Sequence, residues 1–241
     1  MQVQGDEFYI AIALATLAGA SIPIGAALST FDRFLPGWLK EEFRHTVVAF
    51  GGGALLSAVA LVLVPEGSAR LAGGPALLWF ALGGVVFFCI DRALAARGGH
   101  AAQFLAMMLD YVPEAMALGA LLADNLSLAI LMAVLIALQN LPEGFNAFRE
   151  MAQAGGASRG RLLVLFLLMV PVGPLAAHLG RTYLVDAPGL LGAVMMFASG
   201  GILYLLFEDV APQVPLEHHW APPLGAVGGF ALGLAGHLML P

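Results

Sequence analysis

Charged side chains are scarce in this chain of 241 residues. Asp, Glu, Lys and Arg together make up 11% of it, whereas soluble proteins contain about 25%. Hydrophobic residues make up 60%, and the mean hydropathy is +0.90. This composition excludes a separate soluble domain and is typical of a protein that is embedded in a membrane along nearly all of its length.

Several other features are missing. Cysteine occurs once, as Cys89, which excludes a disulfide framework within the chain. The first apolar segment lacks a basic leader and continues to spanning length, so we expect a membrane helix there and not a secretory signal. No phosphate-binding loop of the Walker type occurs, so ATP-driven transport is not expected. No His-Glu-x-x-His motif occurs either, and we do not expect an enzyme.

Long apolar stretches, by contrast, recur along the chain, and a helix that crosses a bilayer needs about 20 apolar residues. We expect eight such helices, near residues 8–30, 43–64, 75–96, 102–123, 127–149, 160–182, 188–211 and 220–240. The connections between them are short. The predicted fold is an all-α membrane protein with eight transmembrane helices in a single polytopic domain, residues 1–241.

The basic residues predict the orientation, because Lys and Arg accumulate on the cytoplasmic side of a membrane. Most of them fall in or near the loops after segments one, three and five: Arg33, Lys40, Arg44, Arg92, Arg97, Arg149, Arg159 and Arg161. Only Arg70 and Arg181 fall on the other side. We therefore expect a multi-pass protein of the cell (inner or plasma) membrane with both termini extracytoplasmic.

Segments two and seven resemble each other. Residues 50–56 (FGGGALL) align with residues 197–203 (FASGGIL) at an offset of 147, which also brings Pro65 onto Pro212. Because the two segments cross in opposite directions, the alignment predicts an inverted repeat of helices 1–3 and 6–8 around a central pair, a 3+2+3 arrangement. A chance alignment of glycine-rich helices is the alternative. The glycines themselves are expected to serve close helix packing.

The central pair carries two matched polar motifs, Asp110-Tyr-Val-Pro-Glu114 and Gln139-Asn-Leu-Pro-Glu143. Residues four apart share one face of a helix, so each motif presents two oxygen-bearing side chains together. Each proline removes a backbone hydrogen bond and frees the carbonyl four residues earlier, as in the interrupted helices of transporters. A glutamate at membrane depth is costly unless it is compensated. The motifs therefore predict a shared site for a cation.

These motifs resemble those of the ZIP (Zrt/Irt-like) divalent-metal transporters, in which helix four carries His-Asn-x-Pro-Glu-Gly and helix five a related Pro-Glu-Gly motif. The sequence is similar to a divergent prokaryotic-type member. The resemblance implies a transport site at Asp110, Glu114, Gln139 and Glu143. It also differs from the family, because Asp110 replaces the usual histidine and Ala115 replaces a glycine. Where other members hold a second metal, this chain has Tyr111, Asn140 and Val170.

Two further residues complete the candidate metal set. Asn140 occupies a second-site position that the resemblance implies, and His178 is a histidine inside the sixth segment. His178 is either a core residue bonded to a neighbouring helix or a supplementary ligand. Outside this set, Glu66 and the acidic and histidine residues of 208–219 either attract ions at the two mouths or are simply solvated.

The expected function is transport of a divalent transition metal toward the cytoplasm by alternating access. Oxygen ligands favour Mn²⁺ or Fe²⁺, while Zn²⁺ is also bound by carboxylates, and Cd²⁺ is a further candidate. The metal is the transported substrate and no other cofactor is expected. The expected partners are the lipid bilayer, no nucleic acid and, as the oligomer considered, a second copy in a homodimer. The alternative is a ZIP-fold protein that carries another substrate or senses metal.

Overall fold

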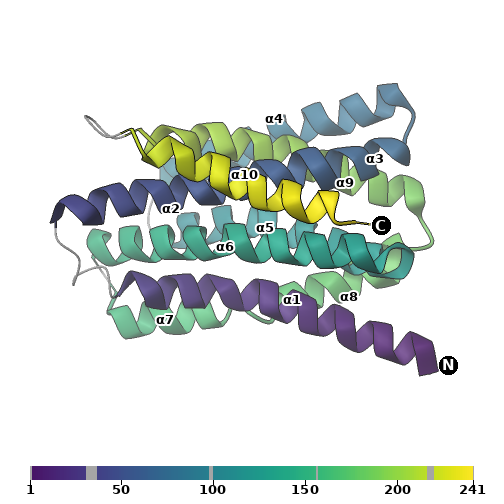
Figure 1. The fold of residues 1–241 in the computed structure, drawn as a ribbon, viewed down its shortest axis with the longest axis horizontal. Coiled ribbons are helices and arrows are strands. Elements are labelled where there is room, and N and C mark those ends of the chain that lie inside the picture. The colour runs from purple at the N-terminus through teal and green to yellow at the C-terminus, as the bar shows by residue number, and fades with distance from the viewer. Residues whose placement is uncertain (1, 31–36, 98–99, 156, 216–219, 241) are drawn as a thin grey trace.

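The computed structural model describes residues 2–30, 37–97, 100–155, 157–215 and 220–240, and every regular element within them is helical. The α-helices are α1 (Gln2–Ser29), α2 (Gly37–Ala58), α3 (Val64–Ala69), α4 (Gly73–Arg97), α5 (His100–Asp124), α6 (Leu126–Ala154), α7 (Arg159–Leu167), α8 (Val172–Leu184), α9 (Pro188–Leu205) and α10 (Pro222–Leu238). They run along one common direction, and the first turn of α1 and the last turn of α10 lie at the same end of the bundle (Figure 1).

Six stretches of the described residues are long and apolar enough to cross a membrane: Tyr9–Ser29, Glu41–Ala69, Gly73–Ala96, Leu126–Ala154, Arg159–Leu184 and Pro188–Gln213. The chain is therefore an all-α, multi-pass membrane protein, as its composition predicts. Helices α5 and α10 are not among the six. They have 25 and 17 residues, and both run alongside the other helices (Figure 1).

Two of these stretches contain a π-helical turn, in which the backbone bonds reach one residue further than in an α-helix. The first turn, η2 (Val59–Leu63), joins α2 to α3, so that one continuous rod runs from 37 to 69. The second, η3 (Leu206–Val210), follows α9 and leads into the 3-10 turn η4 (Ala211–Gln213). Val59 and Leu206 are 147 positions apart. The two irregular turns thus obey the same offset as the sequence alignment of these segments.

Four helix pairs pack through reciprocal glycine contacts, in which a glycine of each helix lies so close to a backbone carbonyl of the other that a Cβ would overlap it. The contacts are Gly53–Ala226 and Gly229–Phe50 between α2 and α10, Gly200–Phe80 and Gly83–Phe197 between α9 and α4, Gly25–Leu141 and Gly144–Ile22 between α1 and α6, and Gly119–Ala177 and Gly180–Met116 between α5 and α8. The predicted packing role is confirmed for Gly53 and Gly200. Close backbone approach of this kind stabilises helix pairs in lipid, where no hydrophobic force drives their association.

The interruptions of helix geometry differ from those expected. Helices α5 and α6 continue through Pro113 and Pro142, so the breaks predicted there are absent. The predicted helix near 160–182 is instead two helices, because residues 168–171 form turns between α7 and α8. Pro171 explains this break, since its ring lacks an N–H and would clash with the carbonyl of Leu167, where α7 ends.

The core lies around α5 and α6. The largest fully buried side chains on these two helices are Tyr111, Leu118 and Leu121 on α5, and Met132, Leu135, Ile136, Phe148 and Met151 on α6. Helix α6 packs against α1, α2 and α5, and α5 packs against α8 and α9. The central position of these two helices places their polar motifs inside the bundle and away from its lipid-facing surface.

Candidate metal site

The two Pro-Glu motifs present most of their polar side chains inward. Asp110 and Glu114 lie one turn apart on α5 and are 3% and 0% exposed. Gln139 on α6 is 2% exposed, and Glu143, one turn further along, is half-buried. Buried polar and charged groups of this kind are costly unless they bind a partner. The spacing of residues within each motif thus has the structural effect that the sequence predicts.

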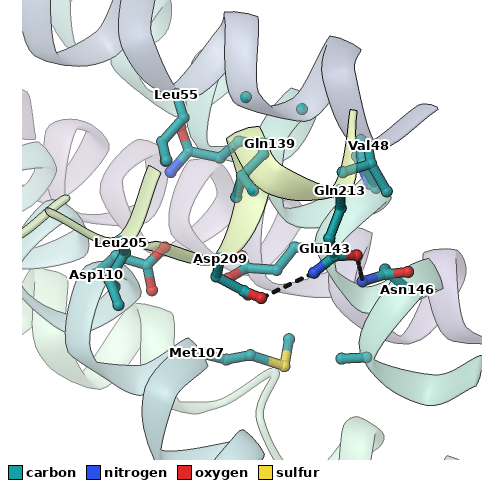
Figure 2. Close-up of a pocket in the computed structure, with 15 residues that line it drawn as sticks. Val48, Leu55, Met107, Asp110, Gln139, Glu143, Asn146, Leu205, Asp209 and Gln213 are labelled. Carbon is teal, nitrogen blue, oxygen red and sulfur yellow. Dashed lines mark hydrogen bonds between the residues drawn. The ribbon is translucent and has the colours of Figure 1, made fainter. Parts of the chain in front are cut away.

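A cavity of about 90 Å³ opens between α2, α5, α6 and the end of the α9 span. Its polar lining consists of Asp110 from α5, Gln139, Glu143 and Asn146 from α6, and Asp209 and Gln213 from the turns after α9. Figure 2 shows these side chains around one shared space. Its described lining contains neither lysine nor arginine. Three carboxyl groups from three separate elements therefore face one space without a basic residue among them.

Asp209 lines this cavity, whereas the sequence places it only among the acidic and histidine residues of 208–219, which either attract ions at a mouth or are solvated. Leu205, Asp209 and Gln213 all line the cavity, each four residues after the one before. Gln213 Nε2 donates a hydrogen bond of 2.8 Å to Asp209 Oδ1. A search of segment seven for polar residues at this helical spacing would have found Asp209. Asp209 and its neighbour Glu208 are both exposed, but only Asp209 lines the cavity.

A hydrogen bond across the cavity wall joins two of its lining elements. Asn146 Nδ2 donates a hydrogen bond of 3.0 Å to Gln213 Oε1, which joins α6 to the end of the α9 span. Nearby, Arg149 of α6 forms an ion pair of 3.1 Å with Glu41 of α2. Both contacts lie on the side of the cavity toward the C-terminal end of α6. They link the helix that carries the second motif to the two elements opposite it.

The innermost polar groups pair with each other only in part. Gln139 Nε2 donates a hydrogen bond of 2.5 Å to Glu114 Oε2, and Asp110 Oδ1 accepts one of 2.8 Å from the backbone N–H of Tyr111. Besides Asn146 Oδ1 in the cavity wall, three buried acceptor oxygens have no hydrogen-bond partner: Glu114 Oε1, Gln139 Oε1 and Asn140 Oδ1. An unsatisfied buried acceptor costs about 1–3 kcal/mol. The chemistry that would satisfy all three is a cation or an external donor.

The structure does not gather all of the predicted ligands around one point. Among the described residues, no group of three or more His, Cys, Asp or Glu side chains stands close enough to hold a metal ion. Glu114 does not line the cavity, because it lies behind Gln139. Asn140 points away from it, since its Nδ2 donates a hydrogen bond of 3.2 Å to the Ala18 carbonyl of α1. The cavity thus contains three of the predicted ligands, namely Asp110, Gln139 and Glu143.

His178 lies on α8 with its side chain exposed, and it does not line the cavity. A ligand role for His178 stays a prediction. At the end of the bundle away from the C-terminal end of α6, Glu66 of α3 is paired with Arg70. Arg70 also contacts Asp124 of α5 at 3.3 Å. Glu66 is therefore part of an ion-pair cluster, and its role in attracting ions stays a prediction. The predicted cluster Glu217, His218 and His219 lies outside the described residues.

The fold and the site together define the class: this is a multi-pass, all-α membrane protein with three acidic side chains, of which Asp110 is buried, around a cavity between its central helices. A scan against protein-family models gave no match, and a search of curated proteins gave none either.

Proposed function

We propose that this chain transports divalent transition-metal ions of the Zn²⁺, Fe²⁺ or Mn²⁺ type across the membrane toward the cytoplasm. The observation that carries the proposal is the cavity in which Asp110, Glu143 and Asp209 face one space without a basic residue in its described lining. Acids inside a membrane bundle are rare and costly, and they mark ion pathways. The unpartnered oxygens of Glu114 and Gln139 beside this cavity also suit a cation.

The ion's path through the site follows from the hydrogen bonds. Asp110, Glu143 and Asp209 supply the first carboxylate oxygens that an ion in the cavity meets. Rotation of the Gln139 side chain breaks its hydrogen bond to Glu114 and turns the Gln139 amide oxygen toward the ion. The Glu114 carboxylate, released from this bond, then faces the ion as well. An all-oxygen set favours a hard ion such as Mn²⁺, while Zn²⁺ and Fe²⁺ accept carboxylates as well. Binding thus replaces the ion's hydration shell in the middle of the bundle.

We also propose that α5 and α10 are membrane spans, which makes eight in all. Helix α5 has 25 residues and α10 has 17, and membrane helices have about 17–25. Both run parallel to the six apolar spans (Figure 1). An even number of crossings fits the position of both chain ends at the same end of the bundle (Figure 1). The distribution of Lys and Arg favours the extracytoplasmic side for these ends.

The helix contacts support an inverted repeat in a 3+2+3 arrangement. The contact of α2 with α10 corresponds to that of α9 with α4, and the contact of α1 with α6 corresponds to that of α8 with α5. At the residue level, Phe50 and Gly53 have counterparts in Phe197 and Gly200, each 147 positions later. The matching π-helical turns obey the same offset. These paired contacts favour the repeat over a chance alignment. On these grounds we propose a divergent protein of the ZIP type.

The grouping of the helices by their glycine contacts supports alternating access. These contacts lock α1 to α6 and α5 to α8, and α6 packs against α5 and also, across the seam, against α2. A second set of glycine contacts locks α2 to α10 and α4 to α9. The cavity lies on the seam between the two groups, since α2 and α9 line one side and α5 and α6 the other. Rocking of one group against the other opens the cavity to each side in turn. The membrane potential favours entry of a cation by about 2.3 kcal/mol per charge at 100 mV.

Uptake into liposomes tests the proposal. Purified wild type, Glu143→Gln and Asp209→Asn are reconstituted and challenged separately with Zn²⁺, Fe²⁺, Mn²⁺ and Cd²⁺. Wild type is expected to take up at least one ion, and both variants are expected to lose most of that uptake. Glu208→Gln is the matched control, because Glu208 precedes Asp209 but lies outside the cavity lining. Its uptake should equal that of wild type.

Binding measured on the same preparations separates transport from sensing. If wild type binds metal but moves none, the protein is a metal sensor and not a transporter. If wild type neither binds nor moves any of the four ions, the metal proposal is wrong and another substrate must be sought for the cavity.

A further inference from the structure

A second cavity, of about 380 Å³, lies between α1, α2 and α6. It has the form of a crevice: Ala137, Leu138, Leu141 and Pro142 of α6 line one side, and Ser21 of α1 and Thr46, Val47 and Phe50 of α2 line the others. Most of these side chains are half-buried, so the crevice is open on one side. Its volume far exceeds the roughly 10–15 Å³ that accommodates one water molecule. It is large enough to take part of a ligand.

The crevice has nothing to offer a polar ligand. In its described lining, Ser21 and Thr46 are the two polar side chains, and each hydroxyl group donates to a carbonyl of its own helix. Ser21 Oγ bonds the Ala18 carbonyl at 2.6 Å, and Thr46 Oγ1 bonds the Glu42 carbonyl at 2.7 Å. No charged side chain occurs among the described residues that line the space. A charged or strongly polar ligand would lose its hydration there without gaining a hydrogen-bond donor.

The crevice continues the lipid-facing surface of the bundle. On α6, Ile130 and Val134 are 43% and 47% exposed, and Ala137, Leu138 and Leu141 follow on the same face at helical spacing. On α1, Ser21 lies between the exposed side chains of Leu17 and Ile24 on one face. In a multi-pass membrane protein such apolar stripes contact hydrocarbon chains. The stripe on α6 therefore leads a hydrocarbon chain directly into the crevice.

We propose that an acyl chain of a bilayer phospholipid binds in this crevice between α1, α2 and α6. The chain fills the gap at the seam between the two groups of glycine-locked helices, because α6 belongs to one group and α2 to the other. It contacts Pro142, whose ring also lines the acidic cavity and packs against Gly51 of α2. Lipid bound here supports the turn of α6 that carries Gln139 and Glu143.

Photolabelling tests the site without reference to metal. The purified full-length chain in detergent micelles receives a few molar equivalents of a phospholipid with a diazirine on one acyl chain. After irradiation, the labelled residues are mapped by mass spectrometry. Label is expected on residues 137–142 and not on residues 77–82 of α4, whose exposed leucines represent ordinary lipid-facing surface. Excess unlabelled phospholipid should compete the label away.

Two variants fill the crevice from opposite walls, Ala137→Phe and Ser21→Leu. Each is expected to reduce labelling of residues 137–142 about tenfold, the change that corresponds to a loss of about 1.4 kcal/mol of binding free energy. Ala81→Phe, on the exposed face of α4, is the control and should leave the labelling unchanged. Equal labelling of α4 and α6, or labelling of α6 that resists both variants and the competitor, would overturn the proposal. If both variants fail to fold, competition by unlabelled phospholipid in wild type decides whether the acyl chain binds specifically in the crevice.

Discussion

At the scale of single residues, Glu114 and Gln139 hold the site together. Glu114 is fully buried, and its one hydrogen bond comes from the Gln139 amide at 2.5 Å. The same amide nitrogen therefore compensates the acid and blocks one of its oxygens from any other partner. The pair links α5 to α6 at the depth of the two motifs. A change at Gln139 should affect both the stability of the bundle and the binding of an ion.

We predict that Gln139→Leu lowers the free energy of unfolding by about 1–3 kcal/mol, because the Glu114 carboxyl group then has neither oxygen satisfied. Metal binding should weaken as well, since one oxygen ligand is lost. Thermal unfolding in detergent and metal titration of the same sample measure the two effects. Gln153→Leu, at an exposed position near the end of α6, is the control. An unchanged melting temperature would contradict the role of the Gln139 amide.

Tyr111 is the other residue whose role the structure specifies. Its hydroxyl end lies against Gly19 of α1 and Gly173 of α8, where a Cβ on either glycine would overlap it. The hydroxyl is 3.5 Å from the Ala15 carbonyl, at the outer limit of a hydrogen bond. We therefore predict that Tyr111→Phe barely changes the melting temperature in detergent. Tyr111→Ala should cost about 3–5 kcal/mol through the void it leaves. Equal effects of the two would show that the hydroxyl bond dominates over the packing.

At the scale of whole elements, the reciprocal glycine contacts determine which helices move together. We predict that Gly53→Ala and Gly200→Ala each destabilise the protein by about 1–3 kcal/mol, because the new methyl group meets a backbone carbonyl that cannot turn aside. Gly74→Ala and Gly189→Ala are the controls, since a Cβ at either position meets nothing within 4 Å. Thermal unfolding in detergent compares the four variants. Similar melting temperatures for all four would mean that the close contacts carry no free energy.

The sequence predicted these elements well where composition alone decides. Apolar runs of spanning length located α1, α4 and α6, and the spacing of Asp110, Glu114, Gln139 and Glu143 predicted which side chains turn inward. It failed where tertiary contacts decide. Pro113 and Pro171 both lie within apolar runs, yet α5 continues through the first and the chain breaks at the second, which Gly173 and Pro174 follow closely. Packing of α5 on both sides maintains its helix, as neighbouring helices often do for proline in membranes.

The contents of the cavity were predictable only in part, for a similar reason. Asp110, Gln139 and Glu143 lie within one recognisable pattern of sequence. Asp209 comes from a segment far along the chain, and the cavity lining shows that it, and not the adjacent Glu208, shares a space with the motif residues. The bond between Gln139 and Glu114 likewise depends on how α5 and α6 pack against each other. Sequence spacing describes one helix at a time, so it cannot reveal a pairing between two.

At the scale of the whole molecule, the orientation in the membrane is directly testable. In a Cys89→Ser background, we predict that a membrane-impermeant maleimide added to intact cells labels Gly74→Cys but not Gly160→Cys. Both positions are exposed glycines with open space around them, at opposite ends of the bundle. Permeabilised cells should show labelling of both. The reverse pattern in intact cells would place both termini in the cytoplasm and contradict the orientation that the basic residues indicate.

The glycine contacts also have a consequence for how the protein is made. Each of the four locked pairs joins helices that are far apart in the chain: α1 with α6, α2 with α10, α4 with α9 and α5 with α8. A ribosome therefore releases α1, α2, α4 and α5 before any of their partners exists. Until α6 emerges, the first helices must wait in the membrane without these contacts, and α2 must wait for the last helix of all. Truncation from the C-terminus should accordingly leave nascent chains that quality-control proteases recognise, even when every remaining helix is intact.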